Sequence, residues 1–420
     1  MIVLKNANYI DWQTIDFKKT DIIVENGMNG KIRFGTEDSV KDATVIDCTG
    51  MIVMKSFVVG HHHAYSALSR GMGAPKKSPS NFYEILEYVW WTLDKALDKD
   101  MVEASAYATA IACAKAGSTF VIDHHASPNC IKGSLDIMAK AFDRVGLSHL
   151  LCYEITDRDG LDNAEAGLEE TADYLKHRQG LVGLHASFTV GDATMKKAVD
   201  LMQFSRSGIH IHVAEDLYDQ EHCVNHHEKR VVERLHEFGA LDSTKTILGH
   251  CLHLSEPERE ILNQSKAWVV QNTESNLNNN VGYFNSKGLS SNILLGTDGM
   301  HSDMLRSAQQ AFFVGQGFDT INYPEAYRRF RNAHHYLSQS GFTGDGDNNL
   351  VVMDYQSPTP IDKDNFLGHF IFGFQSADVK HLISNGTLIL KDRHLQTIDE
   401  SEILKFTQEQ AKRLWKIMKK

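Results

Sequence analysis

Three features that would define common protein classes are missing from this sequence. It contains no run of 18 apolar residues, so we expect no helix that crosses a membrane. Its six cysteines include no CxxC pair, which excludes a disulfide scaffold and fits reduced thiols in the cytosol. Lys and Arg total 43 against 54 Asp and Glu, and no basic cluster is present, so we expect no nucleic-acid partner.

The beginning of the chain also lacks a targeting pattern. Residues 1–12, MIVLKNANYIDW, show no basic segment followed by an apolar one, and we therefore expect a cytoplasmic protein. Apolar residues make up 42% of the 420 residues and charged residues 23%, which is typical of a folded chain with a large core. What is abundant is histidine, with 22 residues, many of them adjacent to one another.

The middle of the chain alternates short apolar segments with longer helical patterns. After the first segment, successive starts lie 22 to 37 residues apart, which is the spacing of βαβ units. The eight segments are 54–60, 118–123, 148–154, 181–187, 208–214, 245–250, 267–272 and 291–298. Eight such units predict an α/β fold of the (β/α)8 barrel type.

Both ends of the chain have the pattern of β-structure. Residues 1–53 contain short strands with Asn-Gly turn signals, and strands return from residue 343 before an amphipathic helix at 400–418. Chain termini often lie close together in space. We therefore predict one composite β-sandwich domain, with a C-terminal helix, from 1–53 and 343–420, and a catalytic barrel from 54–342.

The C-terminal ends of the predicted barrel strands carry residues suited to chemistry. GHHHAYS at 60–66 ends the first strand, and His61 and His63 share one face because side chains alternate along a strand. LGHC places His250 at the end of the sixth strand, and LGTDG places Asp298 at the end of the eighth. Each motif alone could be a surface or capping feature, but together at the end where barrel active sites lie they predict a metal site.

The end of the fifth strand adds a histidine and a carboxylate. HVAED at 212–216 provides His212 and, three residues later, Glu215. His210 could form a rival pair with His212, but it would lie one layer deeper in the barrel, and we interpret it as a core histidine. Glu215 lies beyond the strand end, where a carboxyl group suits general acid–base work better than ligation.

The order of these motifs, HxH, HxAE, GH and TD, resembles the amidohydrolase superfamily. Longer segments of the sequence resemble the chlorohydrolase and aminohydrolase branch of this superfamily, and most of all the SsnA-type aminohydrolases. These segments are HAYSALSRGM (63–72), VIDHHASP (121–128), GLHASFTV (183–190), KRVVERL (229–235) and ESNLNNNVG (274–282). The resemblance covers nearly the whole chain. It implies a metal-holding barrel flanked by a composite β-sandwich, which agrees with the pattern of the strands.

The resemblance also implies roles for individual residues. The implied metal ligands are His61, His63, His212 and Asp298. Glu215 matches the proton shuttle of the family, Asp298 would also take a proton, and His250 matches the histidine that steadies the developing intermediate. His185, at the end of the fourth strand, matches a substrate-binding histidine. His125, at the end of the second strand, could also contact substrate, although a partnered loop histidine is an equally good interpretation.

The implied activity is hydrolysis of a carbon–nitrogen bond other than a peptide bond. The reaction expected first is the deamination of an aminated N-heterocycle or cyclic amidine, with water activated by the metal. The same residues could expel chloride or an alkylamine from a related ring, and an inactive, metal-retaining interaction protein is the alternative from another class.

The expected cofactor is one divalent transition metal per chain. Three histidines and a carboxylate suit zinc first and iron second. Residues 181–190 contain no lysine and no carboxylate that could bridge two metals. The expected partners are a small-molecule substrate and a second copy of the chain in a homodimer, because the aromatic insertion FYEILEYVWWTL (82–93) exceeds what a loop needs.

Three segments depart from the pattern of the family. Lys55-Ser56 stand where relatives have Pro-Gly, Gln271-Asn272-Thr273 where relatives have His-Asn-Pro, and Asn348-Asn349 where relatives have Ala-Asp. None of these residues is a predicted ligand. The second segment lies at the end of the seventh strand, close to the predicted pocket, and therefore leaves the substrate open.

Overall fold

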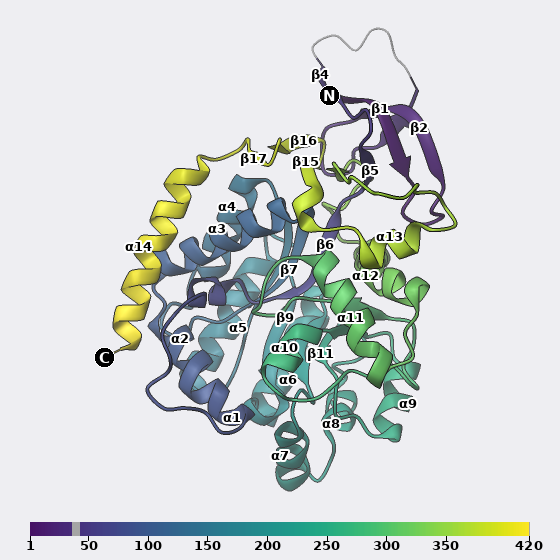
Figure 1. Cartoon of the computed structure of the whole chain (residues 1–420). Helices are drawn as coiled ribbons and strands as arrows, with labels where there is room; N and C mark the ends of the chain where they lie inside the picture. Colours follow the sequence, from purple (N-terminus) through teal and green to yellow (C-terminus); the bar gives the residue numbers. More distant parts are fainter. Residues whose placement is uncertain (36–42, 420) are drawn as a thin grey trace.

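The computed structural model describes residues 1–35 and 43–419. Eight parallel strands of this described part form a barrel (Figure 1). The strands are β6 (Phe57–His62), β7 (Ser118–His125), β8 (Ser148–Tyr153), β9 (Val182–Ala186), β10 (Ile209–Val213), β11 (Ile247–His250), β12 (Trp268–Gln271) and β13 (Ile293–Leu295). They pair in chain order, and parallel bridges from Leu151 to Gly180 and from His62 to Asp298 join the two remaining edges. The predicted α/β barrel is therefore confirmed.

Helices follow each barrel strand. They are α1 (Phe82–Ile85), α2 (Trp91–Ala96), α3 (Lys99–Lys115), α4 (Ser134–Val145), α5 (Leu161–Leu175), α6 (Asp192–Ser205), α7 (Leu217–His227), α8 (Val231–Glu237), α9 (Glu256–Gln264), α10 (Thr273–Asn278), α11 (Met304–Phe318) and α12 (Tyr323–Gln339). Local sequence sets where several begin: Ser255 and Glu258 form a capping box at α9, and Asn322 caps α12.

Helix α12 closes the N-terminal end of the barrel. Its residues Ala333, Tyr336 and Leu337 pack against apolar side chains from the barrel interior, among them Phe120 and Trp268. The hydroxyl of Tyr336 also donates a hydrogen bond of 2.8 Å to the backbone oxygen of residue 245, just before β11. With this end filled by side chains, the opposite end, where the strands finish, is left to hold a site.

Nine strands of the described chain form a second sheet, and they come from both the N-terminal and the C-terminal parts of the sequence. They are β1 (Ile2–Ile10), β2 (Phe17–Val24), β3 (Ile32–Phe34), β4 (Thr44–Asp47), β5 (Ile52–Lys55), β14 (Leu350–Met353), β15 (Val379–Ser384), β16 (Thr387–Lys391) and β17 (His394–Leu395). Strand β5 joins the two ends because it pairs with β1 on one side and with β14 on the other. The segment expected as one strand at 54–60 is thus two strands, and the barrel begins at Phe57.

A buried charge network fixes the junction between β5 and β6. Lys55 Nζ lies 2.9 Å from Asp345 Oδ1, and His334 Nδ1 lies 2.7 Å from Asp345 Oδ2. Arg331, on α12, donates hydrogen bonds from Nη1 to the backbone oxygens of Lys55 (3.1 Å) and Ser56 (3.0 Å). These contacts tie the sheet to the barrel.

The remaining helices are α13 (Phe366–Phe372) and the long α14 (Glu400–Met418). Helix α14 lies along α2 and α3, away from the sheet (Figure 1). Its Trp415 donates a hydrogen bond of 2.8 Å from Nε1 to the backbone oxygen of Leu68. Among the helices of residues 1–35 and 43–419, none combines the length and the apolar character that a membrane span requires.

Candidate active site

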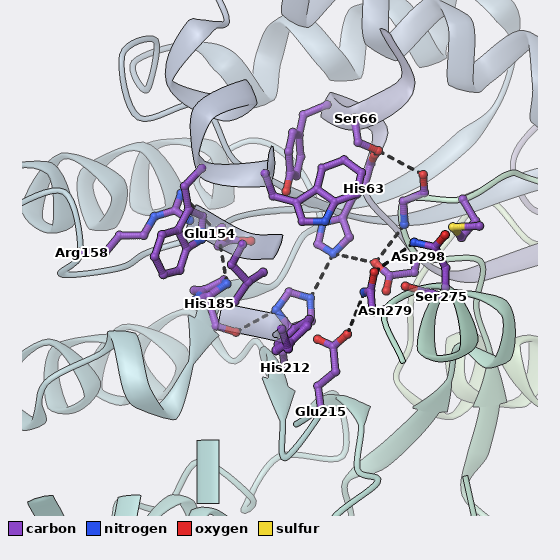
Figure 2. A pocket seen from close by; sticks show the side chains of 18 residues that line it. His63, Ser66, Glu154, Arg158, His185, His212, Glu215, Ser275, Asn279 and Asp298 are labelled. Atoms are coloured by element: carbon purple, nitrogen blue, oxygen red, sulfur yellow. Dashed lines mark hydrogen bonds and ion pairs between the residues drawn. The ribbon is translucent and has the colours of Figure 1, made fainter. Parts of the chain in front are cut away.

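Four of the predicted site residues converge at the C-terminal end of the barrel. His63 Nε2 lies 3.0 Å from His212 Nε2 and 3.1 Å from Asp298 Oδ1. His61 Nε2 lies 3.7 Å from the same carboxylate oxygen. All four residues are buried. The ends of β6 and β10 and the loop after β13 therefore bring together the residues that the sequence predicts as metal ligands. Figure 2 shows His63, His212 and Asp298 of this set.

The hydrogen bonds of two imidazoles define where their lone pairs lie. His63 Nδ1 is 2.7 Å from the backbone oxygen of His124, and His212 Nδ1 is 2.9 Å from the backbone oxygen of His185. A carbonyl oxygen only accepts, so each Nδ1 carries a hydrogen, and in the neutral imidazole each Nε2 carries a lone pair. Orientation of a histidine through its second ring nitrogen is the usual arrangement at metal sites.

His61 provides the third imidazole of this candidate metal-binding cluster. Its Nδ1 lies 2.8 Å from His210 Nε2, so the deeper histidine contacts His61 from below rather than joining the cluster. His61 Nε2 is fully buried and has no hydrogen-bond partner among the described residues. An orphaned buried nitrogen, two converging lone pairs and a carboxylate fit a divalent transition metal of the zinc type.

The charges of the cluster also favour a cation beside Asp298. Burial lowers the pKa of His61 to about 3 and that of His212 well below its ordinary value. Burial likewise opposes protonation of His63, but the Asp298 carboxylate outweighs it and raises the pKa of His63 to about 9. Burial raises the pKa of Asp298, yet its contacts with His61 and His63 bring that pKa well below the ordinary value.

Backbone strain marks three of the strand ends that form the site. Asp298 has φ +52°, His250 has φ +67°, and Ala214, between His212 and Glu215, has φ +47°. Residues other than glycine rarely adopt this left-handed backbone conformation, and such strain is concentrated at functional sites. Here it turns the chain sharply after the strand while the adjoining side chains stay directed at the barrel mouth.

Glu215 and His250 lie together next to the cluster. Glu215 Oε2 is 3.5 Å from His250 Nε2, and Oε1 accepts a hydrogen bond of 3.4 Å from Asn279 Nδ2. Burial raises the pKa of Glu215 to about 7. His250 Nδ1 is 2.7 Å from Asn276 Oδ1, and its Nε2 faces Asp298 Oδ2 at 3.6 Å. A carboxyl group that titrates near neutral pH is suited to giving and taking protons.

A cavity opens over this cluster, and the aromatic insertion forms part of its wall. The insertion contributes Phe82, Leu86, Trp90 and Trp91 from α1, the π-helical turn at 86–90 and α2. The polar part of the lining includes Glu154, Arg158, His185, Glu215, Ser275 and Asn279 (Figure 2). Apolar walls with a few directed polar groups are typical of small-molecule sites.

The two predicted substrate-binding histidines lie in different places. His185 lines the cavity, its Nδ1 lies 2.6 Å from Thr189 Oγ1, and burial lowers its pKa to about 4. His125 is buried, its Nε2 lies 2.9 Å from Ser127 Oγ, and it is not among the residues that line the cavity. The structure therefore brings His185, and not His125, to the candidate site.

Sequence reasoning missed several polar residues of the cavity, among them Glu154 and Asn279. Glu154 directly follows β8, so the same rule of strand ends that selected the histidines would have found it. Asn279 lies just after α10, inside the motif ESNLNNNVG, but nothing in its spacing indicates a contact with Glu215.

The chain belongs to the amidohydrolase family, whose model matches residues 52–341. This result confirms the resemblance seen in the sequence. Relatives extend over the whole chain. A 5'-deoxyadenosine deaminase of Methanococcus maripaludis is 26% identical and aligns with 97% of this chain and 98% of its own length. A 5-methylthioadenosine/S-adenosylhomocysteine deaminase of Syntrophomonas wolfei is 25% identical, with 94% and 93% covered.

Solved structures share the fold. The crystal structure of an adenosine deaminase from Xanthomonas campestris with bound zinc matches with a TM-score of 0.84 at 18% sequence identity. The match covers 98% of each chain. A zinc-holding structure of the same fold and the cluster of ligand-type residues described above both agree with a metal-binding protein.

Proposed function

We propose that this chain removes an exocyclic amino group, as ammonia, from an aminated N-heterocycle of the adenosine type. As a member of the amidohydrolase family, it is a metal-dependent hydrolase of carbon–nitrogen bonds other than peptide bonds, acting on a small molecule. The proposal for the reacting group depends on one observation: a buried carboxyl group, Glu215, with a pKa of about 7 stands beside the metal-type cluster without belonging to it.

The proposed cofactor is one zinc ion per chain, held by His61, His63, His212 and Asp298. The support is the convergence of the ligand atoms of His61, His63 and His212 on one another, the position of the Asp298 carboxylate beside His61 and His63, and the commitment of the Nδ1 atoms of His63 and His212 to backbone oxygens. When bound, the metal would supply Lewis-acid chemistry and bring the pKa of water toward 7.

The protein groups would then move the protons. Water adds through oxygen to the ring carbon that bears the amino group, while Asp298 Oδ2 accepts one of its protons. Glu215, protonated at the start, delivers its proton to the neighbouring ring nitrogen. It then takes up the proton of the added hydroxyl group and passes it to the amino group, which leaves as ammonia while the ring carbon becomes the carbonyl of an amide-like product. Proton exchange with solvent afterwards deprotonates Asp298 and reprotonates Glu215. His250 Nε2, which faces both carboxylates, steadies the tetrahedral centre.

The test is an ammonia-release screen on metal-quantified protein. Adenosine, 5'-deoxyadenosine, 5-methylthioadenosine and S-adenosylhomocysteine represent the proposed class, and chlorinated and alkylamino analogues of the same ring represent the alternative leaving groups. Release of ammonia from at least one amino compound is expected. Turnover of chlorinated or alkylamino analogues alone would contradict the proposal, as would a zinc-loaded protein that is inactive on every compound.

A further inference from the structure

We propose that Glu154 and His185 form an acceptor pair that selects a substrate with a second N–H group, such as an additional exocyclic amino group or a protonated ring nitrogen. The inference rests on the proposed deamination and adds a feature of the substrate to it. In Figure 2, Glu154 and His185 lie on the side of His212 that faces away from Asp298 and Asn279. The pair therefore meets a different part of the substrate from the one that Glu215 would contact.

The carboxylate of Glu154 is buried without a matching set of donors. Its side chain is 2% exposed. Oε2 lies 3.2 Å from His124 Nδ1, whereas Oε1 has only Arg158 Nη2 at 3.8 Å and His185 Nε2 at 4.0 Å. No described residue donates a hydrogen bond to Oε1. Glu154 lines the cavity, so Oε1 is open to a ligand, and a ligand that supplies a hydrogen-bond donor to this charged acceptor gains affinity there.

His185 presents a second acceptor to the same space. We assign the hydroxyl hydrogen of Thr189 to the backbone oxygen of Ala186, 3.2 Å away, so that Thr189 Oγ1 accepts the hydrogen of His185 Nδ1 at 2.6 Å. His185 Nε2 therefore carries a lone pair, and it faces Glu154 Oε1 across 4.0 Å. Two acceptors at this separation can share one amino nitrogen placed about 2.9 Å from each.

Arg158 does not serve as the missing donor. Its guanidinium is held by two other carboxylates, through an ion pair of Nη2 with Asp94 and a contact of 2.9 Å between Nε and Asp159 Oδ2. It also lies over the ring of Trp91, with 5.0 Å to the ring centroid. Of these groups, Glu154 and Arg158 line the cavity, whereas Asp94 and Asp159, which pairs with Lys95, do not. Because the charge of Arg158 is engaged by residues outside the cavity, Glu154 favours a donor or a cation over an anionic group.

A second metal ion is a poorer occupant of this space. The groups that could surround it include His63 or His212, whose Nε2 atoms already point at the Asp298 cluster. An imidazole nitrogen has one lone pair and binds one metal. The Arg158 guanidinium at 3.8 Å from Glu154 would also repel a dication.

The experiment measures binding in a chain that cannot turn over. Zinc-loaded Glu215→Gln is titrated calorimetrically with matched pairs of ligands, 2,6-diaminopurine riboside against adenosine and 2,4-diaminopyrimidine against 4-aminopyrimidine. We expect the diamino member of at least one pair to bind roughly 10- to 100-fold more tightly, the range for a hydrogen bond to a charged acceptor. When Glu154→Gln is added to the same chain, the affinities for the two members of each pair should differ by less than about threefold.

Matched controls separate the possible failures. Glu165→Gln changes an exposed glutamate, paired with Lys197, and should leave the ratio unchanged. Equal binding of both members of each pair, no binding of either, or a preference that survives Glu154→Gln would overturn the inference. A second zinc per chain that Glu154→Gln removes would overturn it as well. Because binding is read without turnover, a donor preference in the absence of any deaminase activity in the unmodified enzyme would contradict the proposed function alone.

Discussion

Replacing Glu215 by glutamine separates proton transfer from metal binding. Glu215 lies three residues beyond His212, its oxygens contact His250 and Asn279, and it forms no hydrogen bond or ion pair with His61 or His63. Glutamine has nearly the same shape and keeps an oxygen that can accept the hydrogen bond from Asn279. Glutamine is also neutral, so it avoids the cost of burying a charged carboxylate, the same cost that raises the pKa of Glu215 to about 7. We therefore expect the melting temperature of the variant to be equal or higher.

The expected loss of turnover follows from the proton that glutamine cannot carry. With a pKa of about 7, Glu215 is half protonated at neutral pH, and it can give a proton and take one back within one cycle. Removal of such a group costs on the order of 10²- to 10⁴-fold in rate. We expect kcat to fall by at least about 10²-fold, with one zinc per chain retained.

The assay is ammonia release by protein whose zinc content has been measured, with binding of a substrate analogue followed in parallel. Glu221→Gln, an exposed glutamate on α7, is the matched control and should be fully active. Near-normal turnover with zinc retained would remove Glu215 from the mechanism. A loss of zinc together with activity would instead make Glu215 part of the metal site.

Elemental analysis should find one transition metal per chain, and His61→Ala should lower the metal content and the activity together, because His61 Nε2 has no other partner. Two tightly held metals per chain would contradict the mononuclear assignment. Sedimentation should give a homodimer, as the sequence predicts, and a monomer at high concentration would show that the aromatic insertion serves only the cavity that it lines.

The barrel was predictable because its strands are buried on both faces. Each of the eight apolar segments of the sequence corresponds to one barrel strand, except the first. There, residues 52–55 and 57–62 are all buried, so the apolar pattern runs on without a break while the chain passes from the sheet to the barrel at Ser56. The division of the chain into domains at residues 53 and 343 stays a prediction.

The predicted ligands lie together because the ends of parallel strands meet at one rim, a property of the fold and not of the spacing. What the sequence does not contain is the second contact of each side chain. The pairing of His61 with His210, and the backbone oxygens that accept from His63 and His212, depend on packing between strands far apart in the chain.

Two departures from the family pattern find a physical reason in the structure. Lys55 lies where a Pro-Gly step is usual, and its ammonium group pairs with the buried Asp345. Gln271, at the end of β12, accepts a hydrogen bond of 2.9 Å from Arg329 Nη1 through its side-chain oxygen. Each change therefore belongs to a polar network that supports the barrel without touching the candidate ligands.

Buried neutral histidines should make the fold sensitive to acid. Burial lowers the pKa of His125 to about 3 and that of His334 to about 4, from an ordinary value of 6.5. Between these values the unfolded chain binds more protons than the folded one, so the free energy of unfolding falls as the pH drops below 6.5 and continues to fall to about pH 4. At pH 5.5 the loss is about 1.4 kcal/mol for each histidine.

His125→Phe isolates one of these contributions. The phenyl ring can fill the space between Tyr65 and Tyr153, and Ser127 keeps its own hydrogen bond to the backbone oxygen of Cys130. Chaotrope unfolding at saturating zinc should show a loss of stability from pH 8 to pH 5.5 that is about 1.4 kcal/mol smaller in the variant than in the unmodified chain. His394→Gln, at an exposed position, should leave the loss unchanged. If His125→Phe leaves it unchanged too, the imidazole of His125 takes up its proton in the folded state as readily as in the unfolded state, and burial does not hold it neutral.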